Sequence, residues 1–595
     1  MPDYRSPVDE IRYTLRHVAD LESIASLEGF EHSDAGTVDD LIEESGRFFE
    51  EVFAPLNRVG DQVGAVRNDD GSVTVPPGFD DAYRRYVEAG WSTVGFPAEY
   101  DGGGFPGLVK LAVQDLMTAS NFSLSVLPML SQGAIEALMH YGTEDQKETY
   151  LRRMVSGEWS GTMNMTEPEA GSDVGALTTK ATPVGDGSWR ITGQKIYISW
   201  GEHELAENII HLVLARTPGS PPGTKGISLF LVPKFLVNDD GSLGEHNDAH
   251  CVSLEHKMGL KASPTCVMAY GDNGGAIGWL LGDEHAGMRA MFTMMNNARL
   301  AVGLEGVGLS ERAYQQALQF ANERLQGRAP GAAPGSPSAI VDHPDVQRML
   351  LEMRAGTAAI RGLCYRNAAA IDRSIHAPTE AERTTADQMA ALLTPLSKAW
   401  STDLAFELTS LGIQVHGGMG YIEETGAAQH LRDARITSIY EGTNGIQAID
   451  LVGRKVPMDG GAVIRRHLAD LRHTATRAAS VPALASAAAH LVTAVDAVSD
   501  VTEWILRDTV ADPAARLPGA TNYLEMLAVT TGGEILIAGA LSVLESGDDA
   551  DEAEDRAILA RFFAANRMAR VRGMAPGVTE LGAELSAGRV RLLKP

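Results

Sequence analysis

The chain is long, moderately apolar and acidic, and these properties limit the classes of protein to which it can belong. Its 595 residues, 44% of them hydrophobic, are enough for several domains with cores of their own. The 50 Lys and Arg residues against 78 Asp and Glu give a net charge of −28, so nucleic acid is not an expected partner. Three cysteines without Cys-x-x-Cys spacing indicate neither a disulfide framework nor a zinc site, and no metal site is expected.

The sequence also predicts a cytoplasmic protein with no integral membrane segment. The chain does not open with a basic stretch followed by an apolar and then a small-residue stretch. The longest apolar runs, such as residues 535–544, are shorter than the roughly 20 residues that a membrane-spanning helix needs. The unpaired cysteines fit a reducing compartment.

Helical periodicity dominates the first part of the chain, and strand patterns follow it. We expect an N-terminal extension at residues 1–38 and a helical domain at residues 39–160, in which residues 124–140 carry apolar side chains on one face. The pattern then changes to short strands over residues 161–282, separated by turns rich in Gly and Pro. The clearest strand patterns are at residues 189–199, 209–215 and 227–232.

Helical periodicity returns after the predicted strands. We expect a helical domain over residues 283–456, with a Gly/Pro/Ser-rich linker at residues 327–338 and a new helix that starts near Pro344. The Ala-rich composition of residues 457–595 predicts an additional helical domain. Within it, residues 529–537 are expected to form a core helix because no Lys or Thr follows their glycines as in a phosphate loop. Binding of a partner or a membrane surface is the alternative role for this last domain.

The order of helices, then strands, then helices predicts the fold class. The predicted strands are grouped in one stretch of the chain, with helical patterns before and after them. The sequence therefore predicts an α+β fold, mostly α, with a separate small β-domain.

One carboxylate lies on a predicted turn just before a helix. The segment Tyr-Glu-Gly-Thr at residues 440–443 precedes a helical pattern that begins near Asn444, and Asn444 with Gln447 resembles a capping box. Glu441 is therefore expected outside the helix start, where it could act as a general base on a bound ligand. A glutamate before a capped helix is more often structural, so this interpretation depends on the other motifs.

Three other segments carry polar groups or glycines suited to a ligand. Residues 163–173 form a loop with hydroxyls and a glycine, and residues 191–201 alternate like a strand that ends in a hydroxyl and an indole. Residues 414–421 contain three glycines, which allow a ligand to approach the backbone closely. Each segment by itself is typical of an ordinary loop. All of them together, in this order, indicate one ligand site.

With these motifs the sequence resembles the acyl-CoA dehydrogenase family from about residue 39 to residue 455. Further motifs that carry the resemblance are at residues 96–104, 141–147, 194–199, 257–259, 297–300 and 323–324. The two chain ends are similar to a long-form bacterial subgroup that acts on 3-methylmercaptopropionyl-CoA and on a broad range of fatty acyl-CoAs. The resemblance implies an N-terminal helical domain, a middle β-barrel-like domain, a C-terminal four-helix bundle and an extra C-terminal helical domain.

The resemblance also implies a reaction, the α,β-dehydrogenation of acyl-CoA to trans-2-enoyl-CoA with noncovalent FAD. Because no side chain accepts hydride, the flavin N5 takes it from the β-carbon, while Glu441 removes the α-proton from the opposite side. The backbone N–H of Glu441 would donate to the thioester carbonyl. Burial is expected to raise the pKa of Glu441 more than the nearby helix start lowers it. Electron-transferring flavoprotein is the expected electron acceptor.

The remaining site residues follow from the resemblance, position by position. Those expected to contact FAD are Met165, Thr166, Gly171, Ser172, Ser199, Arg324, Gln414, Gly418, Thr443 and Gly445. Those expected to contact the acyl-CoA substrate are Ser172, Asn296, Arg299, Tyr440 and Gly442. Arg299 could instead pair with an acidic side chain. Part of the FAD set comes from a neighbouring subunit in the family, so we expect a homo-oligomer, with a dimer favoured over a tetramer.

Some positions depart from the family pattern, and some functions compete with dehydrogenation. Tyr197 and Ser199 stand where many members have Trp and Thr, Met163 stands where many have an aromatic residue, and Gly445 replaces a polar residue. An acyl-CoA oxidase is the nearest alternative because long C-terminal helical extensions occur there too. A DNA-binding flavoprotein relative is disfavoured by the net charge of −28, and a non-catalytic paralogue by the presence of Glu441.

Overall fold

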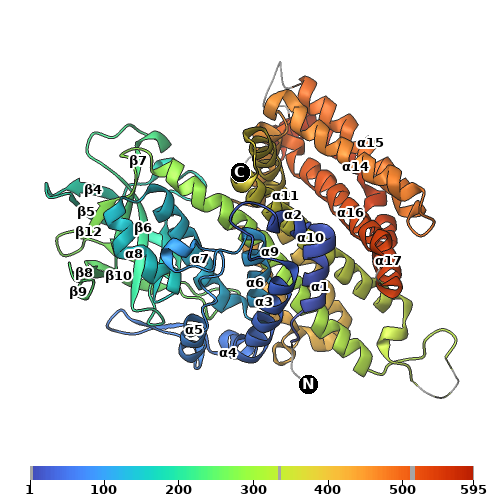
Figure 1. The fold of residues 1–595 in the computed structure, drawn as a ribbon, viewed down its shortest axis with the longest axis horizontal. Coiled ribbons are helices and arrows are strands. Elements are labelled where there is room, and N and C mark those ends of the chain that lie inside the picture. The colour runs from blue at the N-terminus through green and yellow to red at the C-terminus, as the bar shows by residue number, and fades with distance from the viewer. Residues whose placement is uncertain (1–3, 333–334, 336, 509–515, 548, 594–595) are drawn as a thin grey trace. The chain divides into compact units, whose positions relative to one another are not determined.

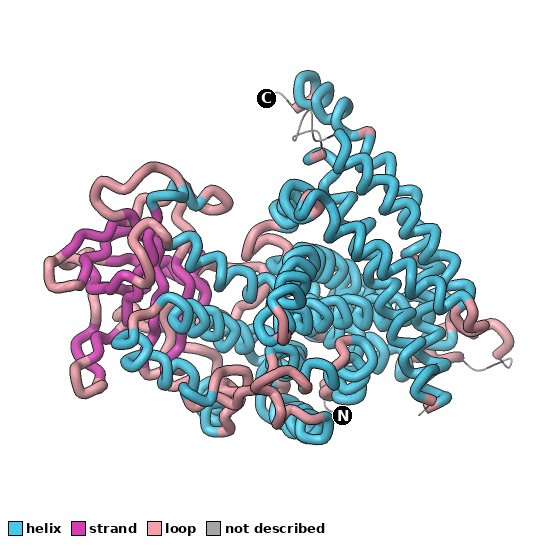
Figure 2. Tube along the Cα trace, turned by 45° about the horizontal axis from the view of Figure 1, so that its top comes forward, coloured by secondary structure: helices cyan, strands magenta, loops and turns pink. Residues whose placement is uncertain are grey.

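Residues 4–593, apart from 333–334, 336, 509–515 and 548, are described by a computed structural model (Figure 1). The chain divides into two units, which we treat separately. The sheet unit comprises Arg47–Phe105 and Ser120–Ala298. The bundle unit comprises Met1–Gly46, Pro106–Ala119 and Arg299–Pro595. The strands, drawn in magenta in Figure 2, all belong to the sheet unit.

The main sheet of the sheet unit has eight strands. They are β3 (Trp159–Asn164), β4 (Lys180–Pro183), β5 (Ser188–Ser199), β6 (Asn208–Arg216), β7 (Ile227–Pro233), β10 (Ala249–Leu254), β11 (Thr265–Tyr270) and β12 (Ala276–Leu280). Their order is β10-β11-β5-β12-β7-β6-β3, and β4 pairs with both β5 and β6. Because β4 joins β5 to β6, the strands β5, β12, β7, β6 and β4 close into a ring. This ring is the barrel-like domain that the resemblance implied.

The three strands predicted from the sequence correspond to β5, β6 and β7, and each prediction is confirmed to within one residue at either end. β7 is buried along its whole length, and β6 along all but its last residue, so both are mostly apolar in sequence. β5 instead alternates between buried and more exposed residues because one of its faces lies outside the core.

Helices and two short ribbons complete the sheet unit. The helices are α4 (Leu56–Val63), α5 (Phe79–Glu88), α7 (Phe122–Tyr141) and α8 (Glu144–Ser156), and the ribbons pair β1 (Val66–Arg67) with β2 (Val73–Thr74) and β8 (Phe235–Val237) with β9 (Leu243–His246). α7 confirms the helix predicted at residues 124–140, and Asn121 caps it by accepting from the Leu124 N–H at 3.2 Å. β3 lies close against α7, because a Cβ atom on Gly161 would lie 2.4 Å from the Cβ of Ala134.

The bundle unit is helical. Its helices before residue 457 are α1 (Val8–Tyr13), α2 (Leu21–Ala25), α3 (Ala35–Phe48), α6 (Gly107–Ser120), α9 (Gly287–Glu323), α10 (Pro344–His376), α11 (Glu380–His416), α12 (Ala427–Thr437) and α13 (Asn444–Asp450), of which α3, α6 and α9 extend beyond the unit at one end. α10 starts at Pro344, as predicted, because a proline at the first helical position loses no hydrogen bond. In the linker predicted at residues 327–338, the Ser338 N–H donates to the Gly327 carbonyl at 3.0 Å, while residues 333–334 and 336 lie outside the described chain.

The C-terminal helices belong to the same bundle unit. They are α14 (Ala462–Ala479), α15 (Ala485–Asp508), α16 (Ala520–Ser546), α17 (Ala550–Asn566), α18 (Val571–Thr579) and α19 (Leu581–Arg591). α16 confirms the core helix predicted at residues 529–537, and its glycines serve packing. A Cβ on Gly532 would lie 2.4 Å from the Trp400 ring of α11, and one on Gly533 would lie 2.4 Å from the Met568 sulfur.

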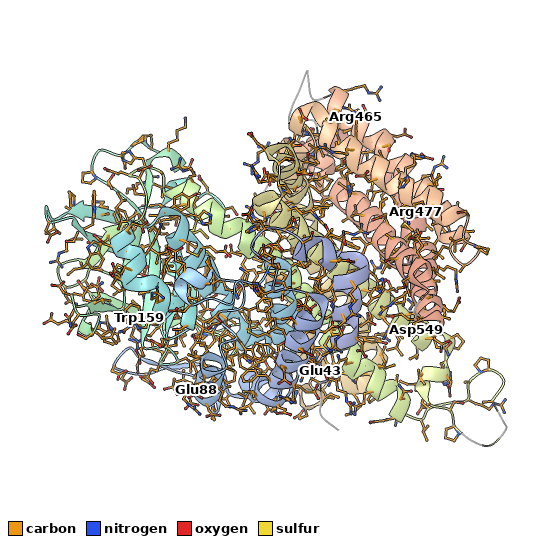
Figure 3. The ribbon with its side chains drawn as sticks, viewed as in Figure 1. Glu43, Glu88, Trp159, Arg465, Arg477 and Asp549 are labelled. Atoms are coloured by element: carbon orange, nitrogen blue, oxygen red, sulfur yellow. The ribbon has the colours of Figure 1, made fainter. Side chains whose placement is uncertain are left out.

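Exposed ion pairs link the outer helices of this region. Arg465 and Arg477, both on α14, are labelled in Figure 3. The Arg465 Nε lies 2.6 Å from Glu503 of α15, and the Arg477 Nη2 lies 2.6 Å from Glu545 of α16. All four side chains are between 43% and 58% exposed, so these pairs contribute little to stability.

Two helices, Phe122–Tyr141 and Leu517–Ser546, are long and apolar enough to cross a membrane, judged by length and composition. In each of them 83% of the apolar window is buried inside the fold, which is the pattern of a core helix. Residues 535–544 belong to a longer apolar helix, so the prediction that this run is too short to span a membrane is wrong. Burial, not length, identifies this helix as part of the core.

Candidate active site

The predicted base lies on a strained turn between α12 and α13 of the bundle unit. Glu441 has φ 54° and Gly442 has φ 82°, so two successive residues adopt left-handed backbone conformations. For a residue with a Cβ this costs about 1–2 kcal/mol, which the surrounding contacts must offset. Strain of this kind collects at functional sites, and here it falls on the residue predicted to be the base.

The cap of α13 differs from the sequence prediction. Thr443 is the N-cap residue, and its Oγ1 accepts from the Ile446 N–H at 3.3 Å. Asn444 is the first helical residue, so the predicted capping box of Asn444 with Gln447 is wrong, although the helix does begin at Asn444. The spacing led to a wrong prediction because the side chains of Asn444 and Gln447 make tertiary contacts, which spacing along the chain does not reveal.

Those tertiary contacts anchor the turn on α11. The Asn444 Nδ2 donates to Thr402 Oγ1 at 2.9 Å and to Asp403 Oδ1 at 2.7 Å, and its Oδ1 accepts from Lys398 Nζ at 2.8 Å. The Gln447 Nε2 lies 3.4 Å from the Glu441 carbonyl oxygen and 3.5 Å from that of Gly442. The backbone at Glu441 and just after it is therefore held by buried side chains.

Glu441 itself has unused hydrogen-bonding groups. The residue is half-buried, but its Oε2 has no contact with solvent and no partner in the described chain. Its backbone N–H likewise has no acceptor among the described residues. Burial raises the pKa of Glu441 above its ordinary value, against the charges of Arg299 and Lys398, which lower it. The direction of this shift agrees with the expectation from the sequence.

Two buried ionisable residues beside Glu441 were not predicted from the sequence. Glu305 of α9 is 1% exposed, and its Oε2 accepts a hydrogen bond from the Tyr440 hydroxyl. Lys398 of α11 is fully buried, and burial lowers its pKa to about 8, against the charges of Glu441, Asp403 and Glu305. Each is a charged residue in an otherwise apolar stretch of helix. The sequence therefore marks both residues as unusual, but it does not show which groups their side chains contact.

Arg299 lies with Tyr440 and Gly442 around the same turn. It is 6% exposed, its Nε has no partner, and it forms no ion pair within the described residues. Burial lowers the pKa of the Arg299 guanidinium, against the charges of Asp450 and Glu441. A Cβ on Gly442 would lie 3.9 Å from Arg299 Nη2, so Gly442 lies next to the guanidinium. A buried cation with unused donors is suited to an anionic or carbonyl group.

The flavin candidates of the sheet unit gather on a loop tied to β5. The Ile196 N–H donates to the Thr166 carbonyl at 2.9 Å, which joins residues 165–167 to the strand that ends at Ser199. Thr166 and Ser199 are half-buried, and neither hydroxyl has a hydrogen-bond partner in the described part of the chain. Two free hydroxyls on adjoining segments are suited to the polar edge of a ring.

A buried ion pair holds this loop in place. Lys195 is fully buried, and its Nζ donates to the Met165 carbonyl at 3.1 Å and to Glu167 Oε1 at 2.8 Å. Burial opposes the ionised form of Glu167, but the charge of Lys195 and hydrogen bonds from Thr178 and Thr179 lower its pKa to about 2. Sequence reasoning did not assign Lys195 or Glu167, although both lie inside the quoted motifs. Further along the loop, Gly171 and Ser172 are exposed, and no other atom lies within 4 Å of a Cβ placed on Gly171.

The remaining FAD candidates of the bundle unit are exposed and lie at helix ends. Arg324 follows α9, Gln414 and Gly418 lie at the end of α11, and Gly445 lies in the first turn of α13. Since α13 contacts α11 near Thr402, Gln414 lies about 12 residues, or about 18 Å of helix axis, beyond that contact. A single chain therefore does not bring Gln414 to Thr443. Asn296 lies on α9, and its side chain is outside the described part of the structure.

Four family descriptions match the chain in succession. They are "Acyl-CoA dehydrogenase, N-terminal domain" over residues 40–158, "middle domain" over 162–272, "C-terminal domain" over 285–456, and "Acetyl-CoA dehydrogenase C-terminal like" over 467–587. The chain belongs to the acyl-CoA dehydrogenase family. It is accordingly an oxidoreductase that acts on the CH–CH group of acyl-CoA thioesters.

Individual relatives extend this similarity over the whole length. A "3-methylmercaptopropionyl-CoA dehydrogenase" from Ruegeria pomeroyi is 42% identical over 586 residues, which are 98% of this chain and 99% of the relative. The "Broad-specificity linear acyl-CoA dehydrogenase FadE5" of Mycobacterium tuberculosis is 36% identical over 78% of this chain and 77% of its own length. Among solved structures, Caenorhabditis elegans ACDH-11 in complex with C11-CoA shares the fold, with a TM-score of 0.79, 21% identity, and coverage of 99% of this chain and 95% of that one.

Proposed function

We propose that Glu441 is the base that removes the α-proton of a bound acyl-CoA thioester. The single observation that carries this proposal is the Glu441 Oε2, which is shielded from solvent, has no partner among the described residues and belongs to a carboxyl whose pKa is raised. A carboxylate with unused acceptor capacity and increased proton affinity is suited to accept a proton from a weak carbon acid. Glu441 also has a left-handed backbone conformation, a kind of strain that is common at functional sites.

The groups around Glu441 support the charge changes of that step. The unpartnered N–H of Glu441 can donate to the thioester oxygen as negative charge develops there. Arg299 and Lys398 are two buried cations close enough to lower the pKa of Glu441, so they favour the ionised form of the base against the effect of burial. Tyr440 and Gly442 complete the substrate side of the turn, and Ser172 and Asn296 are the further substrate contacts that we propose.

We propose FAD as the cofactor, and the residues present are suited to it. Within the sheet unit, the free hydroxyls of Thr166 and Ser199 beside Met165 are suited to the edge of an isoalloxazine ring. No other atoms lie within 4 Å of a Cβ on Gly171 or Gly418, which leaves room for a ligand against the backbone. FAD, when bound, supplies the two-electron acceptor that no side chain provides. An acyl-CoA dehydrogenase structure from Bacillus anthracis is described as complexed with FAD.

We propose a homo-oligomer in which one subunit completes the FAD site of the next. Gln414 lies about 18 Å along α11 from the contact with α13, and this separation of Gln414 and Gly418 from Thr443 and Gly445 of the same chain supports a role at different FAD molecules. A symmetric dimer would supply both sets to each FAD. Arg324 would add a positive charge for the pyrophosphate.

Electron-transferring flavoprotein is the proposed acceptor, and a reducing, cytoplasmic compartment the proposed location. Cys251, Cys266 and Cys364 are all free and buried, which supports such a compartment. The electron acceptor distinguishes a dehydrogenase, which passes its electrons to electron-transferring flavoprotein, from an oxidase, which passes them to O2. Turnover that requires electron-transferring flavoprotein and releases no peroxide in air would support the dehydrogenase, and peroxide release without an added acceptor would support the oxidase.

The decisive test compares the purified protein with its Glu441→Gln variant. Anaerobic titration with 3-methylmercaptopropionyl-CoA, butyryl-CoA and an 11-carbon acyl-CoA should bleach the flavin of the parent with one or more of them. Glu441→Gln should keep bound flavin, because the amide has the same shape, and should slow bleaching by about 10²–10⁴-fold. Bleaching of the variant at the parental rate would rule out Glu441 as the base.

A further inference from the structure

A buried carboxyl beside the base has no role in the reaction as described so far. Glu305 is 1% exposed, its Oε2 accepts from the Tyr440 hydroxyl, and its Oε1 has neither solvent nor a partner among the described residues. Tyr440 precedes Glu441 directly in the chain. A buried oxygen without a partner costs about 1–3 kcal/mol, so its position calls for a functional explanation.

The packing of α9 on α11 explains how Glu305 comes to lie there. A Cβ on Gly303 would lie 2.3 Å from the Ser397 carbonyl oxygen, and one on Gly306 would lie 2.6 Å from that of Ser401. These glycines let the two helices approach closely on either side of Lys398 and Glu305. Glu305 is thereby placed in the same layer as Lys398, which binds Asn444 just after the catalytic turn.

The charged groups around Glu441 come from the turn and from both helices. α9 supplies Arg299 and Glu305, α11 supplies Lys398, and the turn supplies the neutral hydroxyl of Tyr440. Arg299 is in turn influenced by Asp450 and Arg454, and Lys398 by Asp403.

We propose that Glu305 is a positioning residue for the base: its carboxyl anchors Tyr440, fixes the turn that carries Glu441, and changes the charge beside Glu441 when it ionises. This inference rests on the proposed role of Glu441. Burial raises the pKa of Glu305 to about 8, against the hydrogen bond from Tyr440, with a further increase from Glu441 and an opposing effect of Lys398. Glu305 therefore carries a proton at neutral pH, and above about pH 8 it adds a negative charge that increases the proton affinity of Glu441.

The test is the pH dependence of anaerobic flavin bleaching by acyl-CoA in the holoenzyme, for the parent and for Glu305→Gln. The parent should show an inflection near pH 8 that is lost or moved in Glu305→Gln, because glutamine accepts from Tyr440 but does not ionise. Infrared pH-difference spectra of the substrate-free protein give a readout independent of activity. A protonated-carboxyl band that disappears near pH 8 in the parent should be absent from Glu305→Gln. Identical profiles and identical spectra would overturn the proposal.

Two further variants separate anchoring from titration and from general stability. Tyr440→Phe removes the hydrogen bond and should slow bleaching by about tenfold, corresponding to the loss of one buried hydrogen bond. The inflection should remain but move to higher pH, because the hydrogen bond from Tyr440 lowers the pKa of Glu305. An unchanged rate would refute the anchoring role, even if Glu305→Gln did not hold flavin. The matched control is Glu311→Gln on the same helix, whose carboxylate pairs with Arg361 at 3.1 Å. It should leave the pH profile unchanged.

The outcomes also distinguish this inference from the proposed function. If Glu441→Gln bleaches like the parent, the assignment of the base fails and the role of Glu305 fails with it. If Glu441→Gln is inactive but Glu305→Gln keeps the parental profile and spectrum, only the role of Glu305 fails.

Discussion

Two buried charge clusters share helix α9, and they differ in how completely their polar atoms are paired. Around Arg361, the Nε lies 2.7 Å from Asp115 Oδ2 and the Nη2 lies 3.1 Å from Glu311 Oε2, and the Tyr365 hydroxyl adds a bond to Asp115 at 3.1 Å. We call this the Arg361 cluster. Around Glu441, in contrast, Glu441 Oε2, Glu305 Oε1 and Arg299 Nε have no partners within the described residues. We call this the Glu441 cluster.

This difference shows that one helix, α9, contributes residues both to a stabilising network and to the candidate active site. A buried network whose members are paired holds its elements rigidly, whereas unpaired buried groups are unfavourable unless a ligand or a proton engages them. The Arg361 cluster should therefore affect folding when it is broken. The Glu441 cluster should mainly affect reaction rate and its dependence on pH.

The largest stability effect is expected in the Arg361 cluster. Arg361→Met leaves the buried Asp115 and Glu311 without their cation, which should cost about 3–5 kcal/mol of unfolding free energy. Thermal and denaturant unfolding measure this loss. The control Arg373→Met, on the same helix, removes an exposed contact with Asp20 at 3.5 Å and should cost less than about 1 kcal/mol. Equal costs for the two variants would contradict the distinction.

Within the Glu441 cluster, Lys398→Met should change the pH profile more than the fold. It removes a buried positive charge that lowers the pKa of Glu441, so the acid limb of the bleaching rate should move to higher pH. Stopped-flow bleaching from acidic to neutral pH measures the shift. Lys147→Met, which removes a lysine paired with Glu144 at 3.0 Å in the sheet unit, should leave the limb in place.

The pH dependence of stability provides a test of Glu305 that needs no substrate. The pKa of Glu305 is raised from 4.5 in the unfolded chain to about 8 in the fold, so the folded state binds the extra proton between these values. Its contribution to stability is complete below about pH 4.5 and is lost as the pH rises to about 8. Relative to the parent, Glu305→Gln should therefore gain stability from acidic to alkaline pH. If the difference in melting temperature between the parent and Glu305→Gln stayed the same across this pH range, Glu305 would not titrate within it.

The smallest effect is expected at the exposed pairs of α14. Arg477→Ala, at a residue labelled in Figure 3, removes the contact with Glu545. The Arg477 side chain is 46% exposed and that of Glu545 is 58% exposed. Solvent screening limits the loss of unfolding free energy to less than about 1 kcal/mol. Denaturant titration measures this change in unfolding free energy. If Arg477→Ala lost as much unfolding free energy as Arg361→Met, exposure would not distinguish the weak ion pairs from the strong ones.

Much of the fold was predictable because it depends on local patterns. The strands β5, β6 and β7, the start of α10 at Pro344 and the helical state of residues 529–537 follow from apolar periodicity and from proline at a helix start. The candidate site was predictable only through motifs. These motifs led to Glu441, Tyr440, Thr166 and Ser199. Glu441, Thr166 and Ser199 each carry a side-chain oxygen without a partner among the described residues, and Tyr440 directly precedes Glu441.

Other parts of the site could not be predicted, for reasons visible in particular residues. Asn444 and Gln447 have the spacing of a capping box, but their side chains bind α11 and the Glu441 carbonyl instead, while Thr443 takes the cap. The membrane argument depended on run length, whereas burial of α16 against Trp400 decides it. In both cases a partner distant in the sequence outweighs the local signal.

The sequence by itself determined the order of helices and strands, the position of Glu441 on a turn before a helix, and the family. These depend on interactions within a few residues or on motifs read along the chain. Only the tertiary structure decided that Glu305 and Lys398 belong to the site of Glu441. Their contacts cross 135 residues of chain from Glu305 to Tyr440 and 46 from Lys398 to Asn444. The close approach of α9 and α11 at Gly303 and Gly306 creates this cluster, and burial between the helices then shifts the proton affinities of its members.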